Sequence, residues 1–336
     1  MVTIKEVARR AGVSIATVSR VINNVDNVGE KYKEAVLKAI NEMNYHPNLA
    51  ARSLRNRYYK VIGVIIPDFS IPFFEKIIKN IESNFYKEGH ILLFVNTYNS
   101  PKVEKESFCF MLEKQADIIL ICSTGGNEDY LKRYNKRDNL QIILLDRRLK
   151  RHKYPIVRLN KRKGMYLAAD YLAKKGHKKI ALISGPRRVS TNYDRYMGIK
   201  DYLYDHEKTW NGHILYYFGQ FSEQYGYSTM KKLLRNKNHP TAIITGGSVI
   251  AKGVFLYCRK NNLRIPEDIS LISFGDFSSG ELICPRITYI GDEYKKIGNS
   301  LIKLIRLAFT RRLNNIEIVI QPQLYLHDSV MEIKEK

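Results

Sequence analysis

Between Gly12 and Asn23 the chain reads GVSIATVSRVIN, and this stretch carries side chains suited to hydrogen bonding on a helix surface. Apolar residues recur at Val18, Val21 and Ile22, at the spacing of one helix face. The other positions hold short hydroxyl and amide groups and one arginine, rather than the Glu and Lys of a solvated helix. Such groups bond phosphate oxygens, and an arginine can bond two acceptors on a guanine edge, so the stretch is suited to binding DNA.

The residues up to about 46 predict three short helices that position this stretch. Thr3 and Glu6 form a capping box that opens the first helix, which a glycine ends. Ser14 is suited to cap a second helix over about 15–22. A third helix is expected over about 31–43, and its inward positions are Val36, Leu37, Ile40 and Met43. Two helices joined by a glycine-containing turn, with one apolar core, make a helix-turn-helix.

In a helix-turn-helix the second helix enters the major groove with its first residues against base edges. Ile15 and Ala16 are expected to pack on thymine methyl groups, and Arg20 to bond guanine O6 and N7. The small polar residues expected to contact phosphates are Ser14, Thr17, Ser19 and Asn23. The alternative is an ordinary surface helix with one arginine.

From Val61 onward, apolar runs alternate with amphipathic stretches such as FFEKIIKNIESNFYKEG. The expected strands are VIGVII, HILLFVN, ADIILIC, LQIILLD, PIVRL, KIALIS, GHILYYF, TAIITG and ISLISF. This alternation predicts βαβ units and parallel sheets that are covered on both faces. Nine or so strands over about 270 residues fit two sheets better than one.

With 44% hydrophobic and 26% charged residues, the chain has the composition of a folded protein. Its 336 residues exceed the usual size of a domain, so we expect more than one structural unit. The net charge of +23 favours a polyanionic partner. However, the residues up to Arg57 hold ten Lys/Arg and five Asp/Glu, a net of +5, which leaves +18 for the rest. The charge of the whole chain is therefore weak evidence for DNA binding.

The cysteines and apolar runs exclude several classes of protein. Cys109, Cys122, Cys258 and Cys284 lack metal-ligand spacing, so we expect reduced thiols and no metal site. The N-terminus does not resemble a signal peptide, and no apolar run approaches the ~18 residues that a membrane span needs. We therefore expect a soluble, cytoplasmic protein that does not contact membranes.

The stretch TIKEVARRAGVSIATVSRVIN is similar over its whole length to the N-terminal signature of the Lac repressor/Gal repressor (LacI/GalR) family of bacterial transcription regulators. NEMNYHPNLAARSL is similar to the family segment that comes after this signature, and the resemblance extends over the entire chain. The ATVSRVIN form most resembles the branch containing the catabolite control proteins. The family implies a small all-α helix-turn-helix head, followed by a two-lobed α/β domain similar to periplasmic sugar-binding proteins, with Rossmann-like parallel sheets.

The resemblance divides the chain into three parts. A DNA-binding domain over 1–46 is followed by a hinge helix or linker over 47–58 and by an effector-binding and dimerisation domain over 59–336. Within that last domain, the expected N-lobe covers about 59–160 and 292–320, and the C-lobe about 161–291 and 321–330.

The family implies that the hinge helix folds only on operator DNA, where it pairs with its dimer mate in the minor groove. A leucine from each chain enters the central base step, and the matching position is Leu54. An apolar wedge of this kind kinks DNA at the cost of unstacking the bases. Ala51 is small enough to let two such helices approach, and Arg55 supplies phosphate-binding charge. The alternative is that Leu54 packs on the following domain.

The family also implies a small-molecule effector in the cleft between the lobes. IPFFEKIIKNIE is similar to its N-P-F-F segment and places Phe73 and Phe74 at the cleft or beside it, where an aromatic face can stack on a sugar ring or a base. Core packing is an equally good interpretation of Phe74. LLDRR resembles the segment that ends the fourth strand and makes Asp146 and Arg147 candidate polar groups.

SGPRRVSTNYDRYMGI resembles the family segment with an R-x-x-G pattern, and by that match Arg195 is the strongest ligand-binding candidate. Thr191 and Tyr193 are expected to bind ligand from the loop before it. Phe221, in GQFSEQYGY, falls on another pocket position. A surface salt bridge is the alternative role for Arg195.

Two departures from the family pattern bear on the effector. Ser248, in GGSVIAKG, replaces an aspartate, and Gly275, in SFGD, replaces the first of two aspartates, of which Asp276 remains. A cleft without those carboxylates suits neutral polyols less well, so an anionic effector such as a sugar phosphate becomes more plausible. The opposite interpretation is a lost pocket and a protein corepressor. Catabolite control proteins are regulated by a serine-phosphorylated phosphocarrier protein. A candidate binding site for such a partner is the basic stretch GNSLIKLIRLAFTRR.

The sequence thus predicts a homodimeric regulator, a repressor rather than an activator, that reads a pseudo-palindromic operator. The resemblance implies an A/T-rich operator with a central CG step. No cofactor is expected. A rival interpretation is an enzyme or sugar-phosphate-binding protein on the same scaffold, but the chain has no GxGxxG, P-loop, GxSxG or HExxH motif.

Overall fold

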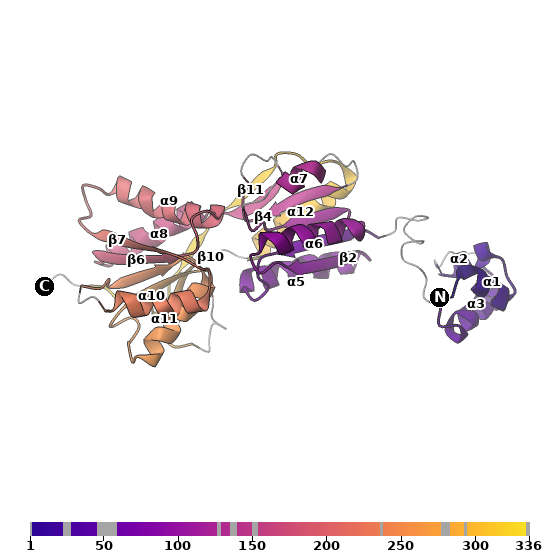
Figure 1. The fold of residues 1–336 in the computed structure, drawn as a ribbon, viewed down its shortest axis with the longest axis horizontal. Helices are drawn as coiled ribbons and strands as arrows, with labels where there is room; N and C mark the ends of the chain where they lie inside the picture. The colour runs from indigo at the N-terminus through magenta and orange to yellow at the C-terminus, as the bar shows by residue number, and fades with distance from the viewer. Residues whose placement is uncertain are drawn as a thin grey trace. The chain divides into compact units, whose positions relative to one another are not determined.

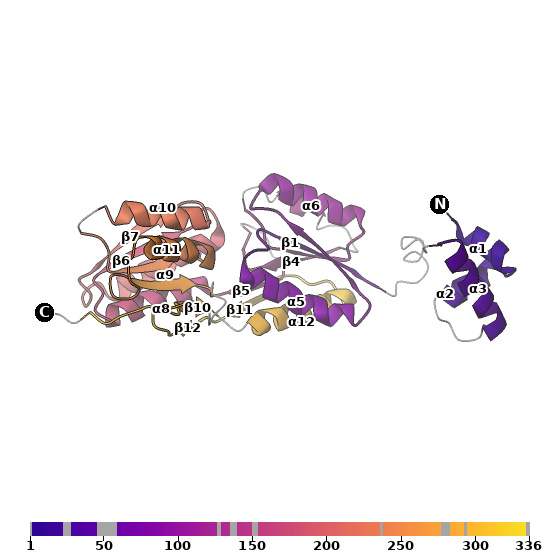
Figure 2. The same ribbon diagram turned by 90° about the horizontal axis from the view of Figure 1, so that it is seen from below.

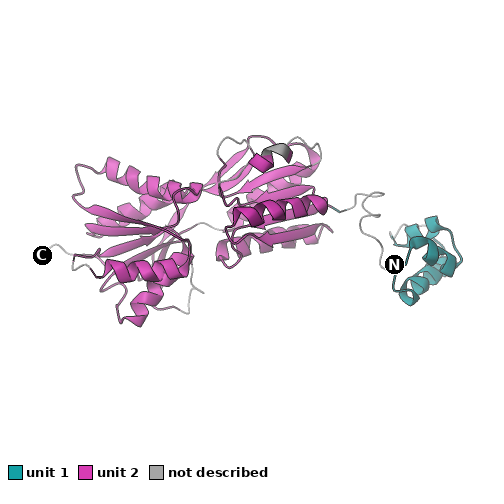
Figure 3. Ribbon diagram, viewed as in Figure 1, with its two compact units in different colours: residues 1–59 teal, residues 60–336 magenta. Residues whose placement is uncertain are grey.

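The computed structural model describes most of the chain (Figures 1 and 2). The described residues are 2–22, 28–45, 59–125, 129–134, 140–149, 154–235, 238–276, 283–291 and 294–333. The chain divides into two compact units, residues 1–59 and 60–336 (Figure 3). The predicted hinge helix over 47–58 lies outside the described residues. Within the described ranges, no helix is long and apolar enough to cross a membrane.

The smaller unit is a three-helix head. Its helices are α1 (Ile4–Ala11), α2 (Ile15–Ile22) and α3 (Glu30–Glu42). Thr3 and Glu6 form the predicted capping box at the start of α1, and Gly12 ends that helix with φ 65°. The backbone N–H of Thr17 donates to Ser14 Oγ at 3.1 Å, so Ser14 caps α2 as predicted. The helices share one small core made of Val7, Ala8, Val18, Val21, Val36, Ala39 and Tyr45.

One inward position predicted for the third helix is wrong. Leu37 is 45% exposed, whereas Val36 and Ala39 are buried. Successive residues of an α-helix lie about 100° apart around its axis, so a helix that turns Val36, Ala39 and Ile40 inward leaves Leu37 facing water.

The first half of the larger unit, here called the N-lobe, is built on a sheet with the strand order β11-β5-β4-β3-β1-β2. The strands are β1 (Val61–Ile66), β2 (Ile91–Asn96), β3 (Ile118–Ile121), β4 (Gln141–Leu145), β5 (Ile156–Leu159) and β11 (Glu317–Ile320). All neighbouring strands are parallel. One face packs on α5 (Pro72–Tyr86) and α12 (Tyr294–Thr310), and the other on α6 (Pro101–Glu113) (Figure 2). Helix α7 (Asp129–Tyr134) contributes Tyr130 and Leu131 to the core on the α6 face.

The second half, the C-lobe, repeats this architecture with the order β12-β10-β9-β8-β6-β7. The strands are β6 (Lys179–Ser184), β7 (His213–Phe218), β8 (Ala242–Thr245), β9 (Ser270–Phe274), β10 (Thr288–Gly291) and β12 (Gln323–Tyr325). Helices α8 (Lys161–Lys174) and α9 (Ser190–Asp205) cover one face, and α10 (Glu223–Leu233) and α11 (Ser248–Lys260) cover the other (Figure 1). Each face buries its own apolar core, so both sheets are three-layered α/β sandwiches.

The predicted fold class is confirmed, with one refinement. All nine apolar runs expected as strands form β1 to β9. The described residues contain three further strands, β10, β11 and β12, which the apolar pattern did not predict. The pairing of β10 with β12 is antiparallel, so the C-lobe sheet is not wholly parallel.

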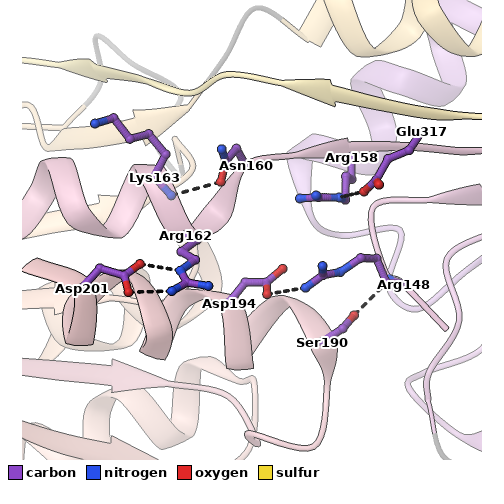
Figure 4. A network of polar contacts seen from close by, with 9 residues as sticks. All are labelled: Arg148, Arg158, Asn160, Arg162, Lys163, Ser190, Asp194, Asp201 and Glu317. Atoms are coloured by element: carbon purple, nitrogen blue, oxygen red, sulfur yellow. Dashed lines mark hydrogen bonds and ion pairs between the residues drawn. The ribbon is translucent and has the colours of Figure 1, made fainter. Parts of the chain in front are cut away.

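The chain crosses between the lobes three times, from β5 to α8, from β10 to α12 and from β11 to β12. Two of these crossings are bonded to each other. Asn160 Nδ2 donates to Gln321 Oε1 at 3.1 Å, and the backbone N–H of Asn160 donates to Ile320 O at 2.9 Å. Beside them, Arg158 on β5 pairs with Glu317 on β11 at 2.5 Å (Figure 4). The crossings therefore form a bonded joint between the lobes.

Candidate nucleic-acid interface and ligand cleft

Helix α2 turns its apolar residues into the head and its predicted DNA-reading residues outward. Val18 and Val21 are buried, whereas Ile15 is 38% exposed. Ser14, Ala16 and Arg20 are also exposed, and Thr17 and Ser19 are half-buried. Arg20 makes no ion pair with any residue that the structure describes. The helix thus presents small groups and one guanidinium that forms no ion pair within the described ranges, which suits close approach to a groove.

Some predicted DNA contacts cannot be placed. Asn23, Ala51, Leu54 and Arg55 lie outside the described residues, so their roles stay predictions.

A cleft of about 740 Å³, counted with its open mouth, lies where the two lobes meet. Carboxyl ends of parallel strands and the starts of the following helices form its walls, as is usual for ligand sites in open α/β sheets. The cleft is lined by the predicted residues Phe73, Asp146, Arg147, Thr191, Arg195, Phe221, Ser248 and Asp276. Phe74 is 4% exposed, belongs to the N-lobe core and also reaches the cleft wall.

The predicted position of Tyr193 needs correction. Thr191 and Tyr193 were expected on a loop, but α9 begins at Ser190 and contains both. Thr191 and Arg195 lie on the helix face that lines the cleft, whereas Tyr193 is 46% exposed and is not part of the lining. The reason is helical geometry, because Tyr193 lies about 200° around the axis from Thr191.

The cleft also contains residues that no sequence pattern singled out. The most important are Lys161, Asn192, Phe274 and Tyr294. Lys161 begins α8, directly after the helix cap Asn160 and the carboxyl end of β5. Because ligands bind at the carboxyl ends of parallel strands, the position of Lys161 directly after a strand could have identified it as a cleft residue.

Lys161 and Asp146 form an ion pair across the cleft, Nζ to Oδ1. Asp146 follows β4 in the N-lobe, and Lys161 belongs to the C-lobe; their side chains are 10% and 4% exposed. Burial alone would raise the pKa of Asp146, but the cations around it, Lys161 first, hold that pKa below its usual value. Burial lowers the pKa of Lys161, with Asp146 opposing this effect. The backbone of Asp146 has φ 66°, a conformation that concentrates at functional sites.

Arg195 is buried and forms no ion pair with a carboxylate among the residues that the structure describes. The residue is 7% exposed, its Nη1 donates to Asn192 Oδ1 at 2.8 Å, and its Nε has no hydrogen-bond partner among the described residues. Its guanidinium lies 4.6 Å from the ring centre of Phe274 and 5.9 Å from that of Phe221. Burial lowers the pKa of Arg195 to about 10. The alternative of a surface salt bridge is therefore wrong.

A separate polar contact joins the lobes beside the cleft (Figure 4). Arg148, after β4, pairs with Asp194 on α9 at 2.5 Å, and its backbone N–H donates to Ser190 Oγ at 3.0 Å. The nearby Arg162–Asp201 pair, by contrast, joins α8 to α9 within the C-lobe.

The two parts of the chain each match a family model. Residues 3–48 match the model described as bacterial regulatory proteins, lacI family. Residues 59–321 match the model described as periplasmic binding proteins and sugar binding domain of LacI family. The chain belongs to the LacI family.

Similar proteins agree with this assignment. The HTH-type transcriptional repressor PurR of Edwardsiella ictaluri is 30% identical over 334 residues, which cover 99% of this chain and 98% of that protein. The structure of the Lac repressor dimer bound to operator and the anti-inducer ONPF has a TM-score of 0.81 at 23% identity and covers 98% of this chain and 99% of that one. A LacI family regulator from Enterococcus faecium with bound ribose has a TM-score of 0.71 at 25% identity and covers 82% and 100%.

This LacI-family chain is accordingly a DNA-binding transcriptional repressor with a ligand-binding domain, and not an enzyme. Its described residues contain no group of three or more His, Cys, Asp or Glu that could hold a metal ion.

The two departures from the LacI-family pattern lie next to each other. Gly275 has φ 87°, and a Cβ at this position would lie 4.0 Å from Ser248 Cβ. An aspartate at 275 would adopt a strained backbone, so the glycine fits this local conformation. At Gly247, a Cβ would lie 2.1 Å from Phe221 Cζ, so the Phe221 ring depends on that glycine. At these two positions the C-lobe wall has thus exchanged carboxylates for small residues, which lie beside the Phe221 ring.

Proposed function

We propose that this LacI-family chain acts in the cytoplasm as a homodimeric repressor, controlled by a sugar or sugar phosphate in the interlobe cleft. We assign residues 1–46 to DNA reading, 47–58 to the hinge and 59–336 to effector binding and dimerisation. The observation that carries this proposal is the presence, in one chain, of an outward-facing second helix in the head and a cleft lined by a buried arginine whose Nε has no hydrogen-bond partner among the described residues. Ligand binding that alters the lobe arrangement would move the hinge segments and so change DNA affinity, with reciprocal linkage.

The operator is proposed to be a pseudo-palindrome, A/T-rich with a central CG step. A single head exposes only a short helix for reading bases, and a twofold dimer places two such helices on two half-sites. The Lac repressor relative is described as a dimer bound to operator.

An exposed aromatic pair supports dimerisation of the larger unit. Phe94 lies on β2, the strand at one edge of the N-lobe sheet, and is 54% exposed. Its ring stacks on that of Phe69, itself 39% exposed, with 5.4 Å between their centres. Exposed aromatic area next to an open sheet edge is typical of a surface that another chain covers.

The side chains that line the cleft are suited to bind a monosaccharide. Phe73, Phe221 and Phe274 offer ring faces, and Thr191, Asn192 and Ser248 offer hydrogen-bonding groups. The regulator from Enterococcus faecium binds ribose, a ligand of comparable size.

A protein corepressor of the phosphocarrier type remains the alternative, with α12 as its candidate surface. One face of α12 is committed to the N-lobe core through Ile297, Leu301 and Ile305. On its outer face, Arg306 pairs with Glu88 at 2.5 Å. The helix therefore has less free basic surface than its sequence indicates. A sugar-phosphate-binding protein without a DNA function is disfavoured by the outward face of α2.

Selection of bound duplexes from a random DNA pool, repeated at two salt concentrations, tests the proposal. A palindromic consensus that survives the higher salt supports it, because non-specific binding falls steeply with salt. Salt-sensitive binding without a consensus, in the presence and absence of sugars and sugar phosphates, would contradict it.

A further inference from the structure

The cleft contains more positive charge than its own carboxylates neutralise. Arg147, Lys161 and Arg195 line it, against Asp146 and Asp276. Asp146 is already paired with Lys161. Arg147 donates to Ser123 O at 2.9 Å and to Asn99 Oδ1 at 3.0 Å, both of which are uncharged. Buried charges are ordinarily paired, but among the described residues no carboxylate forms an ion pair with Arg195, and the carboxylate that acts on it most strongly, Asp146, is already bonded to Lys161.

Lys161 and Arg195 border the same aromatic ring. Arg195 Cζ lies 4.6 Å and Lys161 Nζ 5.7 Å from the ring centre of Phe274. The two cations repel each other, and the charge of Arg195 adds to burial in lowering the pKa of Lys161. An anion placed between them would remove that repulsion and bond the free Nε of Arg195.

Helix starts add further donors on the same side of the cleft. Helix α9 begins at Ser190 and α11 at Ser248, and neither has a side-chain N-cap. Thr191 and Asn192 in the first turn of α9, and Ser248 at the start of α11, line the cleft. Free N–H groups and the positive end of the helix dipole favour an anion at such positions.

We propose that the effector bears a phosphate monoester, which Arg195 and Lys161 bind and which competes with Asp146 for Lys161. A phosphate has three terminal oxygens and up to two negative charges, so it satisfies two cations and the helix starts better than a carboxylate does. This inference rests on the ligand-binding role proposed for the cleft. Because Asp146 belongs to the N-lobe and Lys161 to the C-lobe, the exchange replaces a direct tie between the lobes with one through the ligand.

Isothermal titration calorimetry of the full chain tests the ligand class. The probes are glucose 6-phosphate, fructose 6-phosphate and ribose 5-phosphate, together with the neutral parent sugars and gluconate. We expect at least one ester to bind and its parent sugar to bind at least about tenfold more weakly, since charge-assisted hydrogen bonds are lost. Equal binding of ester and parent, tighter binding of gluconate, or no binding of any ester would overturn the proposal.

Two variants with opposite expected effects test the competition. Lys161→Met should weaken ester binding at least about tenfold, because a charged contact is lost. Asp146→Asn should strengthen it about threefold or more, because Lys161 is released from its partner. Lys163→Met is the matched control, since Lys163 lies on the same helix, is exposed and does not line the cleft. Weaker ester binding in both cleft variants would contradict the proposed competition, because it would mean that Asp146 contributes to ligand binding.

Operator binding by the same samples separates this inference from the proposed function. Variants that keep the wild-type consensus are folded, so their ester affinities can be compared directly. If the protein binds its operator but no ester, the phosphate assignment is wrong and the proposed repressor function is unaffected. Ester binding without any operator consensus defeats the repressor assignment alone.

Discussion

Asp146 and Lys161 join the two lobes from opposite walls of the same cleft, and Lys161 is the first residue after the chain crosses from β5 into the C-lobe. A change of partner at Lys161 therefore acts at the joint between the lobes. Removing either side chain alone leaves a buried charge without its partner, which is why Lys161→Met and Asp146→Asn both need a folding control.

Arg20→Ala should relax sequence preference at one base pair per half-site by about 1–3 kcal/mol, because a bidentate contact to guanine is lost. Affinities for single-base operator variants, measured for both proteins at one salt concentration, check this. An unchanged preference with uniformly weaker binding would mean that Arg20 contacts only phosphate.

Leu54→Ala should lower operator affinity and spare non-specific binding, because the wedge acts only at a kinked centre. The measurement is a pair of titrations, one with the selected operator and one with a scrambled duplex. Equal losses on both would contradict the hinge-helix assignment, which lies outside the described residues.

Gly275→Asp should weaken binding of a phosphate ester, because it places a carboxylate beside Ser248. The change should also lower the free energy of unfolding by about 1–2 kcal/mol, since φ 87° disfavours side chains. Gly275→Asn is the control, with the same strain and no charge. Equal ester affinities in the two variants would show that charge at this wall does not matter.

Lowering the pH should destabilise the C-lobe through His177. Its Nδ1 lies 2.9 Å from Thr241 Oγ1 and its Nε2 3.2 Å from Met331 O, and burial lowers its pKa from 6.5 to about 4. Between these two values the unfolded chain binds a proton that the folded chain does not. The His177 contribution is therefore fully present above pH 6.5 and is lost as the pH falls toward 4, by about 2 kcal/mol at pH 5.

Urea unfolding of wild type and His177→Gln at pH 7.5 and pH 5 measures this contribution. The glutamine variant should lose about 2 kcal/mol less than wild type over that interval. Parallel losses in the two proteins would assign the acid sensitivity to other groups.

Phe94→Glu should raise the dimer dissociation constant about thirtyfold or more, because the substitution places a charge in the covered aromatic surface. Sedimentation velocity over a range of concentrations measures the constant. Phe110→Glu is the control, since Phe110 is also exposed, at 41%, but lies on α6 rather than at the sheet edge. A dimer unaffected by Phe94→Glu would place the interface elsewhere.

Regular apolar runs made most of the fold predictable from sequence. Strands such as Val61–Ile66 are buried on both faces, so nearly every residue is apolar and the run is conspicuous. Strands β11 and β12 hold only four and three residues, are not fully buried, and include Glu317 and Gln323, so no comparable pattern marks them. Both strands lie at sheet edges and pair with strands distant in the sequence, β11 with β5 and β12 with β10, which local composition does not reveal.

Site residues that belong to a family motif could be predicted from the sequence, whereas residues whose place in the cleft depends on tertiary structure could not. Arg195 and Thr191 belong to a recognisable segment, whereas Tyr193 in the same segment points away because α9 starts earlier than expected. Lys161 belongs to no motif, and its importance depends on Asp146, fifteen residues away and in the other lobe. Pairing across a cleft is not encoded in local spacing.

The three lobe crossings also determine the order in which the chain can complete its fold. The N-lobe is incomplete until α12 and β11 have been made, up to residue 320, and by then the whole segment from 161 to 291 has already been synthesised. The C-lobe in turn waits for β12 at 323–325. Long-range contacts of this kind slow folding, whereas every contact of the head core comes from residues 2–45. On the ribosome, the head should therefore fold long before either lobe. Both lobes should complete their folds at nearly the same time, once β11 and β12 have been synthesised.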